Sequence, residues 1–193
     1  MVNAMPIPSV SPPMNPIQNA AGSAAKRQFT VADVESILSA IPDPEIPVVS
    51  IRELGILREL SVDGDTVDVV ITPTYSGCPA IGQIEEDIRA ALAQHHLTAR
   101  ISTRLAPAWS TDWIDAATRD KLRSYGIAPP QGHAAVSDNI VRFSARKTAA
   151  SSIACPQCGS VNTTETSHFS STACKALYKC LDCLEPFDYF KPY

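Results

Sequence analysis

Two pairs of cysteines near the end of the chain have the spacing of a metal-binding module. The pairs are Cys155 with Cys158 and Cys180 with Cys183. Each pair places two thiolates on one tight turn, and two such turns supply the four sulfur ligands of a closed zinc site. A module of about 40 residues has too small a core to fold alone, so bound metal would stabilise it. The spacing predicts a zinc ribbon over residues 153–193, with an iron-sulfur cluster at the same cysteines as the alternative.

A fifth cysteine, Cys174, lies within the predicted ribbon, shortly before Cys180. Its thiolate could serve as an exchangeable ligand or as a ligand that faces a partner. A buried cysteine can equally act as a small apolar residue. Both interpretations stay open, and Cys174 is a candidate metal ligand beside the four paired cysteines.

The sixth cysteine, Cys78, lies between a predicted strand and a predicted helix, in the segment Thr74–Pro79. Exposed amides and the positive dipole end at a helix N-terminus lower the pKa of a thiol, and Pro79 suits the first helical position. Cys78 is therefore predicted to be a functional thiol that ligates or transfers metal. The alternative is a buried cysteine without reactivity.

Two acidic residues, Asp43 and Glu45, lie in Pro42–Pro47, a segment that contains three prolines. Proline fixes the backbone at its own position and restricts the residue before it, so this segment is predicted to be a rigid loop that presents both acids. An acidic loop is usually solvated and has no binding role. A loop that prolines hold in one conformation favours the interpretation as a docking surface.

The elements that position these residues follow from the apolar pattern. Apolar residues recur at helical spacing after Thr30 and within Pro79–Gln94, and they alternate along Thr98–Leu105. Asp63-Gly64 favours a hairpin turn within Ile56–Thr72. The predicted fold class is α+β, with a small sheet and helices packed on it, followed by a four-cysteine zinc ribbon.

The predicted organisation has four parts. Residues 1–28 are rich in proline and small residues and are predicted to be a disordered tail. The α+β domain is expected over residues 29–128, where Trp109 and Trp113 belong to the core or to a contact between the domains. Residues 129–152 are predicted to be a linker that leads to the ribbon at 153–193.

Composition narrows the classes of function. The chain has 193 residues and a net charge of −4 at pH 7, so it offers no basic surface that would attract nucleic acid. It contains neither a run of apolar residues long enough for a membrane span nor an export signal, which predicts a cytoplasmic location. Dinucleotide-binding, phosphate-binding and nucleophile-elbow motifs do not occur in the sequence, which predicts a non-catalytic protein.

Several motifs in the right order resemble the PaaD family, the accessory subunits of bacterial phenylacetyl-CoA epoxidase. The resemblance runs from about Thr30 to Tyr193 and includes the four-cysteine ribbon. The other motifs are Asp43–Pro47, Leu54–Ile56, Ile71–Pro79, Pro107–Trp113 and Glu185–Phe190. This chain has Ser170 at a position where the family usually has glycine.

The first domain is similar to the iron-sulfur assembly domain of SufT proteins and of the cytosolic iron-sulfur targeting factors of eukaryotes. In that wider family the functional positions are the cysteine that matches Cys78 and the acidic loop that matches Asp43 and Glu45. The resemblance thus implies that Cys78 transiently binds iron or an iron-sulfur cluster, and that the acidic loop shapes a docking surface.

The resemblance also implies an accessory subunit of an NADPH- and oxygen-dependent monooxygenase. That complex epoxidises the ring of phenylacetyl-CoA in aerobic phenylacetate degradation, and its catalytic centres lie on other subunits. The implied partners are those subunits, including the reductase, and the iron-sulfur assembly machinery. The implied role is maturation of a metal centre, and the alternatives are a purely structural subunit or a general iron-sulfur cluster assembly factor.

Overall fold

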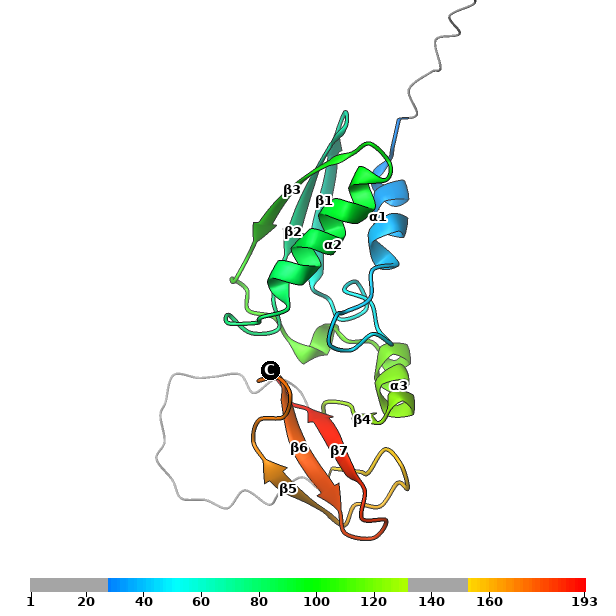
Figure 1. Ribbon diagram of the computed structural model, residues 1–193, viewed down its shortest axis with the longest axis vertical. Coiled ribbons are helices and arrows are strands. Elements are labelled where there is room, and N and C mark those ends of the chain that lie inside the picture. Colours follow the sequence, from blue (N-terminus) through cyan, green and yellow to red (C-terminus); the bar gives the residue numbers. More distant parts are fainter. Residues whose placement is uncertain (1–27, 132–152) are drawn as a thin grey trace, which may run out of the picture.

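The computed structural model describes residues 28–131 and 153–193, which form two small sheets with three α-helices (Figure 1). Most of the predicted tail and most of the predicted linker lie outside the described residues. The predicted α+β class, with a small helix-covered sheet and a ribbon after it, is confirmed.

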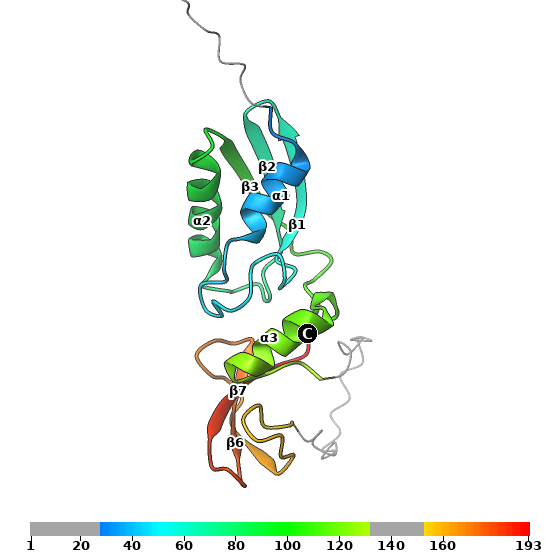
Figure 2. The same ribbon diagram turned by 90° about the vertical axis from the view of Figure 1, so that its right-hand side faces the viewer.

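The first sheet has three strands in the order β1-β2-β3. The elements around it are α1 (Val31–Ser39), β1 (Leu57–Asp63), β2 (Thr66–Ile71), α2 (Ile81–Ala93) and β3 (Thr98–Thr103). The first two strands form an antiparallel hairpin, whereas β2 and β3 are parallel and need a crossover, which α2 provides. Figures 1 and 2 show α1 and α2 side by side on one face of the sheet.

The first helix begins as its sequence predicts. Thr30 accepts a hydrogen bond from the N–H of Asp33, and the Asp33 carboxylate accepts one from the N–H of Thr30, which completes a capping box. The helix ends before Pro42, and its buried face carries Val34 and Leu38.

Two predicted boundaries are wrong by one or two residues. The hairpin turn is Gly64-Asp65 rather than Asp63-Gly64, because the glycine takes the first turn position with a φ of 59°. The second helix begins at Ile81 rather than at Pro79, and its N-cap is Ala80, which makes no side-chain cap. Cys78 therefore lies in the loop before the helix and outside its first turn.

The second sheet has four strands in the order β4-β7-β6-β5. A short 3₁₀ helix and α3 lead into it from the first sheet, and the ribbon supplies the other three strands. The elements are η1 (Thr111–Trp113), α3 (Ala116–Tyr125), β4 (Ile127–Ala128), β5 (Thr163–Ser167), β6 (Lys175–Cys180) and β7 (Pro186–Phe190). Strand β4, which the sequence did not predict, pairs with β7 in parallel. The end of the segment assigned to the first domain thus adds a strand to the ribbon sheet.

Aromatic packing joins the ribbon to the first sheet. The ring of Trp109 lies 5.8 Å from that of Phe190 and 6.4 Å from that of Tyr193, measured between centroids. The backbone N–H of Thr111 donates to the carbonyl of Tyr193 at 3.1 Å. Phe190 and Cys174 of the ribbon consequently belong to the same buried cluster as the core of the first sheet.

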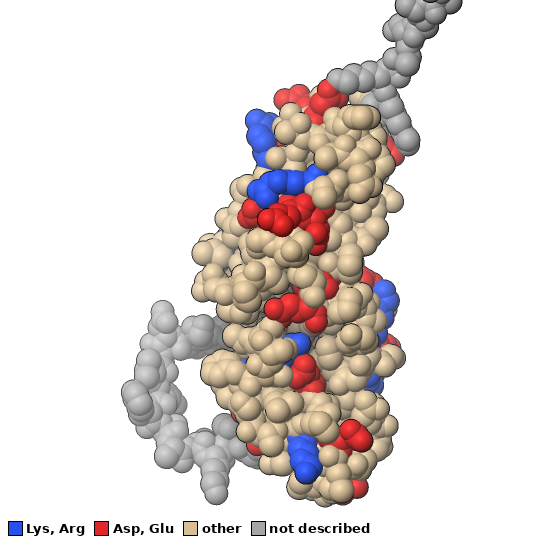
Figure 3. Space-filling view, viewed as in Figure 1, with Lys and Arg blue, Asp and Glu red and all other residues tan. Residues whose placement is uncertain are grey.

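Acidic and basic side chains are mixed on the surface. On the face drawn in Figure 3, the blue and red side chains of the described residues alternate and do not gather into a broad basic patch. Several of them form ion pairs, such as Arg104 with Glu59 and Arg100 with Asp68. Among the helices formed by residues 28–131 and 153–193, none has the length and apolar character needed to cross a membrane.

Candidate functional site

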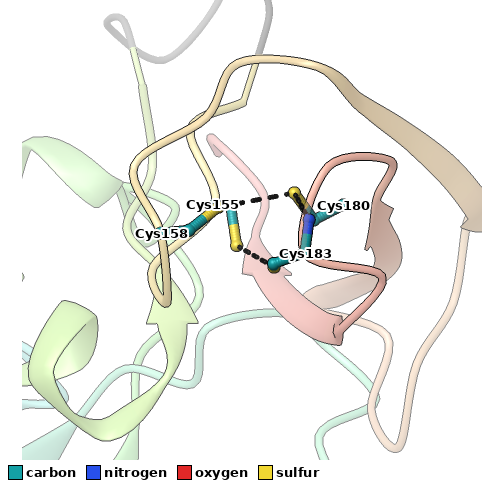
Figure 4. A group of neighbouring side chains, drawn as sticks. All are labelled: Cys155, Cys158, Cys180 and Cys183. Carbon is teal, nitrogen blue, oxygen red and sulfur yellow. Dashed lines mark hydrogen bonds between the residues drawn. The ribbon is translucent and has the colours of Figure 1, made fainter.

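The ribbon brings its four paired cysteines into one cluster, and their sulfur atoms all lie within 4.8 Å of one another (Figure 4). Cys155 and Cys183 have their sulfurs 3.7 Å apart, and the sulfurs of Cys158 and Cys180 are 3.6 Å apart. A tetrahedral zinc ion with Zn–S bonds of about 2.3 Å has sulfur–sulfur distances of about 3.8 Å. The donor set and its spacing therefore fit a metal ion of this kind.

Two tight turns hold these sulfurs in place. In the first turn, Gly159 has a φ of 76° and donates its N–H to the carbonyl of Cys155 at 2.9 Å. In the second turn, between β6 and β7, the N–H of Cys183 donates to the sulfur of Cys180 at 3.5 Å and lowers the pKa of that thiol to about 7. Because a metal ligand must be a thiolate, this hydrogen bond favours the ligand form.

Asp182 ties the two turns together. Its carboxylate accepts a hydrogen bond from the amide of Asn162 at 2.7 Å and another from the hydroxyl of Ser160. Such contacts around the ligands hold the sulfurs at the separation that a metal needs.

Cys78 is half-buried in the loop between β2 and α2, and its N–H donates to the carbonyl of Tyr75 at 3.1 Å. Burial raises the pKa of the Cys78 thiol, although a hydrogen bond from the backbone of Ala80 opposes this effect. The predicted lowering of this pKa is therefore wrong. The helix begins too late to place its first amides around the sulfur, and desolvation outweighs the hydrogen bond that remains.

Asp43 is only 6% exposed, so the predicted presentation of both acids on a surface is wrong for this residue. Its Oδ1 accepts hydrogen bonds from the N–H groups of Glu45, at 2.9 Å, and Ile46, at 2.8 Å, which turn the carboxylate inward. Burial raises the pKa of Asp43, while these two N–H groups and the charge of Lys175 lower it. Glu45 is half-buried in the same loop.

Cys174 is 7% exposed and lies immediately before β6, on the side of the ribbon that packs on the first sheet. Its sulfur lies 3.0 Å from the hydroxyl of Thr172. Burial raises the pKa of Cys174, and Thr172 and Lys175 oppose this shift.

The structure brings these residues together where the first sheet meets the ribbon. Cys78 and Cys174 pack against the same buried cluster, and each thiol lies within electrostatic range of both acidic side chains. The loop after α1 and the loop before α2 both lie at the end of the first sheet that faces the ribbon (Figures 1 and 2). We call the set the interface cluster; it consists of Asp43, Glu45, Cys78, Cys174 and Lys175.

Sequence reasoning missed Lys175. Its side chain is 5% exposed, and its ammonium group forms an ion pair with Asp188 at 3.2 Å. A lysine next to a cysteine in a short strand gives no signal of burial, because the burial depends on tertiary packing. Lys175 and Glu45 line one pocket at this junction.

Two parts of the chain match models of known protein families. Residues 31–102 match the family described as "Iron-sulfur cluster assembly protein", and residues 142–191 match the "PaaD zinc beta ribbon domain". An iron-sulfur assembly domain followed by a zinc ribbon is thus the class that the fold and the clustered cysteines define.

The chain belongs to the PaaD family. It is 45% identical over 162 residues to a protein of Escherichia coli that is named as a putative subunit of 1,2-phenylacetyl-CoA epoxidase, a match that covers 83% of this chain and 92% of that protein. It is also 33% identical over 88 residues to the "Fe-S protein maturation auxiliary factor" of Porphyromonas gingivalis, covering 44% of this chain and 83% of that one.

A solved structure is similar to about half of this chain. The crystal structure of a domain of unknown function, DUF59, from Bacillus anthracis is 25% identical and has a TM-score of 0.44. The match covers 47% of this chain and 89% of the Bacillus chain.

Proposed function

We propose that this protein is a non-catalytic accessory subunit that works with 1,2-phenylacetyl-CoA epoxidase in phenylacetate degradation and assists the maturation of a metal centre in that complex. The observation that carries the proposal is the position of Cys78. Its thiol lies in a loop beside two acidic side chains, within a domain whose family assembles iron-sulfur clusters. The extensive match to the epoxidase protein of Escherichia coli supports the assignment to this pathway.

In this proposal the two thiol sites have different roles. The four ribbon cysteines hold a permanent zinc ion, whose chemistry is structural because all four ligand positions are taken by sulfur. Cys78 binds iron or an iron-sulfur cluster transiently and passes it on. Glu45, the more exposed of the two acids, contributes to the surface on which a partner docks.

The proposed partners are the other subunits of the epoxidase and the iron-sulfur assembly machinery, and the proposed location is the cytoplasm. A purely structural subunit is the second candidate, favoured by the ribbon, because a closed site of four sulfur ligands serves the fold alone. A general iron-sulfur assembly factor is the third candidate, favoured by the match to the maturation factor of Porphyromonas gingivalis.

The test replaces Cys78 in cells. A strain that lacks this protein is complemented with the wild type, with Cys78→Ser, or with Ser76→Ala, a control that changes an exposed hydroxyl in the same loop. We expect Cys78→Ser to abolish epoxidase activity while the variant protein accumulates and unfolds at the wild-type temperature. The iron content of the oxygenase purified from these cells should fall with activity.

The outcomes separate the three candidates. Unchanged epoxidase activity with Cys78→Ser would overturn the maturation role. A purely structural subunit would instead copurify stably with the oxygenase and tolerate the substitution. A general factor would lower the activity of iron-sulfur enzymes such as aconitase as well as that of the epoxidase.

A further inference from the structure

A pocket of about 250 Å³ lies beside the loop between β2 and α2, at the junction that Trp109 forms with the last strand of the ribbon. Tyr75 and Ser76 of that loop line the pocket, and so does Tyr193 near the end of the chain. No member of the interface cluster lines this pocket. It is therefore separate from the residues to which the proposed function assigns a role.

Most of the pocket wall is apolar and aromatic. Leu105 and the rings of Trp109 and Tyr193 belong to it. The indole N–H of Trp109 donates to the carbonyl of Leu54 at 2.8 Å, and the hydroxyl of Tyr193 donates to that of Ala173 at 2.9 Å. The polar atoms of both aromatic side chains are thus engaged within the protein, which leaves their carbon surface to a ligand.

Two threonine hydroxyls are the polar groups that this pocket offers. Thr72 is 2% exposed and Thr74 is 8% exposed, and both line the pocket. Neither hydroxyl is hydrogen-bonded to another residue within the described part of the chain. In those same residues every fully buried side-chain oxygen or nitrogen has a partner, so these two hydroxyls must reach open space, and the pocket provides it. A ligand oxygen placed there can accept a hydrogen bond from either of them.

The size and charge of the pocket restrict its ligand. An apolar cavity of about 150 Å³ binds benzene, so about 250 Å³ has room for a phenyl ring and a short polar substituent. Among the described residues that line it, none is an aspartate, glutamate, lysine or arginine. A charged group would lose its hydration there without gaining an ion pair, so the part of the ligand that enters should be neutral.

We propose that this pocket binds the arylacetyl group of a neutral amide or of a thioester. The ring lies against Trp109, Tyr193 and Leu105, and the carbonyl oxygen accepts a hydrogen bond from Thr72 or Thr74. The choice of an arylacetyl group rests on the proposed function, because the related protein of Escherichia coli is named after an enzyme of phenylacetyl-CoA. The uncharged aromatic character of the site follows from the pocket alone.

A ligand in this pocket would touch the loop that carries Cys78. The carbonyl of Tyr75, a residue of the pocket wall, accepts the N–H of Cys78 at 3.1 Å. Binding would therefore bring the state of the pocket to the proposed functional thiol through one hydrogen bond of the backbone.

The fluorescence of Trp109 reports binding directly. The chain has two tryptophans, so Trp113→Phe leaves Trp109 as the single indole. The full chain with this substitution is titrated with phenylacetamide. We expect a saturable change in emission with a Kd of about 10 µM to 1 mM, the usual range for a ligand of about ten heavy atoms. Acetamide, which lacks the ring, should give no saturable change, and phenylacetate, which carries a charge, should bind at least about tenfold more weakly.

Variants in the same background test the assigned contacts. Thr72→Val combined with Thr74→Val keeps the size of both side chains, and neither hydroxyl has a described partner to lose, so the fold should persist. The lost hydrogen bond should weaken phenylacetamide about 2–12-fold. Ala108→Phe adds a ring at an exposed residue of the pocket wall and should abolish binding. Thr98→Val, an exposed threonine at the other end of β3, is the matched control and should bind as before.

Thermal unfolding shows that each variant is folded, and the outcomes then decide the inference. The absence of a saturable change with phenylacetamide would overturn the site. Equal binding of acetamide or of phenylacetate would overturn the assigned ligand chemistry, and unchanged affinity in both the threonine double variant and Ala108→Phe would overturn the assigned position.

The proposed function fails in a different experiment. Normal epoxidase activity with Cys78→Ser would remove the maturation role and leave the binding of phenylacetamide unaffected. Loss of activity with Cys78→Ser, together with no binding of phenylacetamide, would keep the maturation role and remove only the ligand site.

Discussion

The indole ring of Trp109 packs against the phenyl ring of Phe190, with 5.8 Å between the ring centroids. Trp109 also donates its indole N–H to the carbonyl of Leu54 at 2.8 Å, so one side chain joins the first sheet to the last strand of the ribbon. The interface cluster depends on this junction, because Cys78 and Cys174 come from its opposite sides. The packing that holds the ribbon in place is thus also what places both thiols at one buried cluster.

Trp109→Ala should lower the free energy of unfolding by about 3–5 kcal/mol, the usual cost of deleting a buried aromatic side chain. Trp109 is 4% exposed, so the cavity would open at the centre of the junction. Trp109→Phe keeps most of the packing and removes the hydrogen bond to Leu54, which should cost about 1–3 kcal/mol. Urea unfolding followed by circular dichroism measures both changes. A cost for Trp109→Ala no larger than that of Trp113→Ala, at the half-buried neighbouring indole, would contradict this account of the junction.

Removing the ribbon metal should unfold the second sheet. Structural zinc contributes about 10–16 kcal/mol of apparent binding free energy in small zinc modules, far more than a core of this size can supply. A strong chelator, or Cys155→Ser, should abolish the near-ultraviolet signal of Tyr178, Phe187 and Tyr189, which pack together in the ribbon core. The far-ultraviolet signal of α1 and α2 should persist.

Cys78→Ser is the matched control for this experiment, since it removes a thiol outside the ribbon. It should keep the chelator-sensitive transition of the wild type. A ribbon signal that survives complete removal of the metal would show that the four cysteines are not needed for this fold.

The sequence predicted the features that depend on residues close together in the chain. Each ribbon cysteine pair lies on one turn, so its spacing alone predicts a clustered site, and the apolar stripe of α2 follows from helical periodicity. Strand β4 was missed because two residues carry no pattern of their own, and Ile127 and Ala128 become a strand only by pairing with β7.

The interface cluster needed the tertiary structure. Nothing in the sequence says that Cys174 packs into the same buried cluster as Cys78, since that placement depends on how the ribbon packs on the first sheet. The inward turn of Asp43 depends on two backbone N–H groups of its own loop, and the raised pKa of Cys78 depends on burial by segments far away in the chain. Burial of the thiol, which outweighs the hydrogen bond from the backbone of Ala80, reverses the predicted direction of that pKa shift.

Alkylation should therefore be slow at Cys78 near neutral pH. Its pKa lies above the ordinary value of 9.0 because of burial, so less than about 1% of the thiol is ionised at pH 7. The rate of carbamidomethylation by iodoacetamide should rise about tenfold per pH unit below the pKa, because the thiolate is the nucleophile. Mass spectrometry of the metal-loaded protein measures the rate at this residue, with glutathione as the reference thiol. A rate at pH 7 above that of glutathione would mean that the thiol is activated after all.

Asp43→Asn should leave the protein folded and remove a component of its pH dependence. Burial raises the pKa of this carboxyl above its ordinary value of 3.8, so the folded state binds more protons than the unfolded state between these two values. Stability therefore falls as the pH rises through this window, and the full cost of the buried charge is present above the folded-state pKa. Asparagine keeps the Oδ1 acceptor for the N–H groups of Glu45 and Ile46 and carries no charge, so the variant should equal or exceed the wild type in stability at pH 7.

Urea unfolding of both proteins between pH 4 and pH 8 measures this difference, and the pH response of the ribbon cancels because both carry the same ribbon. Asp43→Ala is the control, since it leaves the two N–H groups of the loop without their acceptor and should cost about 1–3 kcal/mol at every pH. If Asp43→Asn were as unstable as Asp43→Ala at pH 7, the ionised carboxylate would be supporting the loop. In that case the charge of the carboxylate, and not only its Oδ1 acceptor, would be needed by the folded loop.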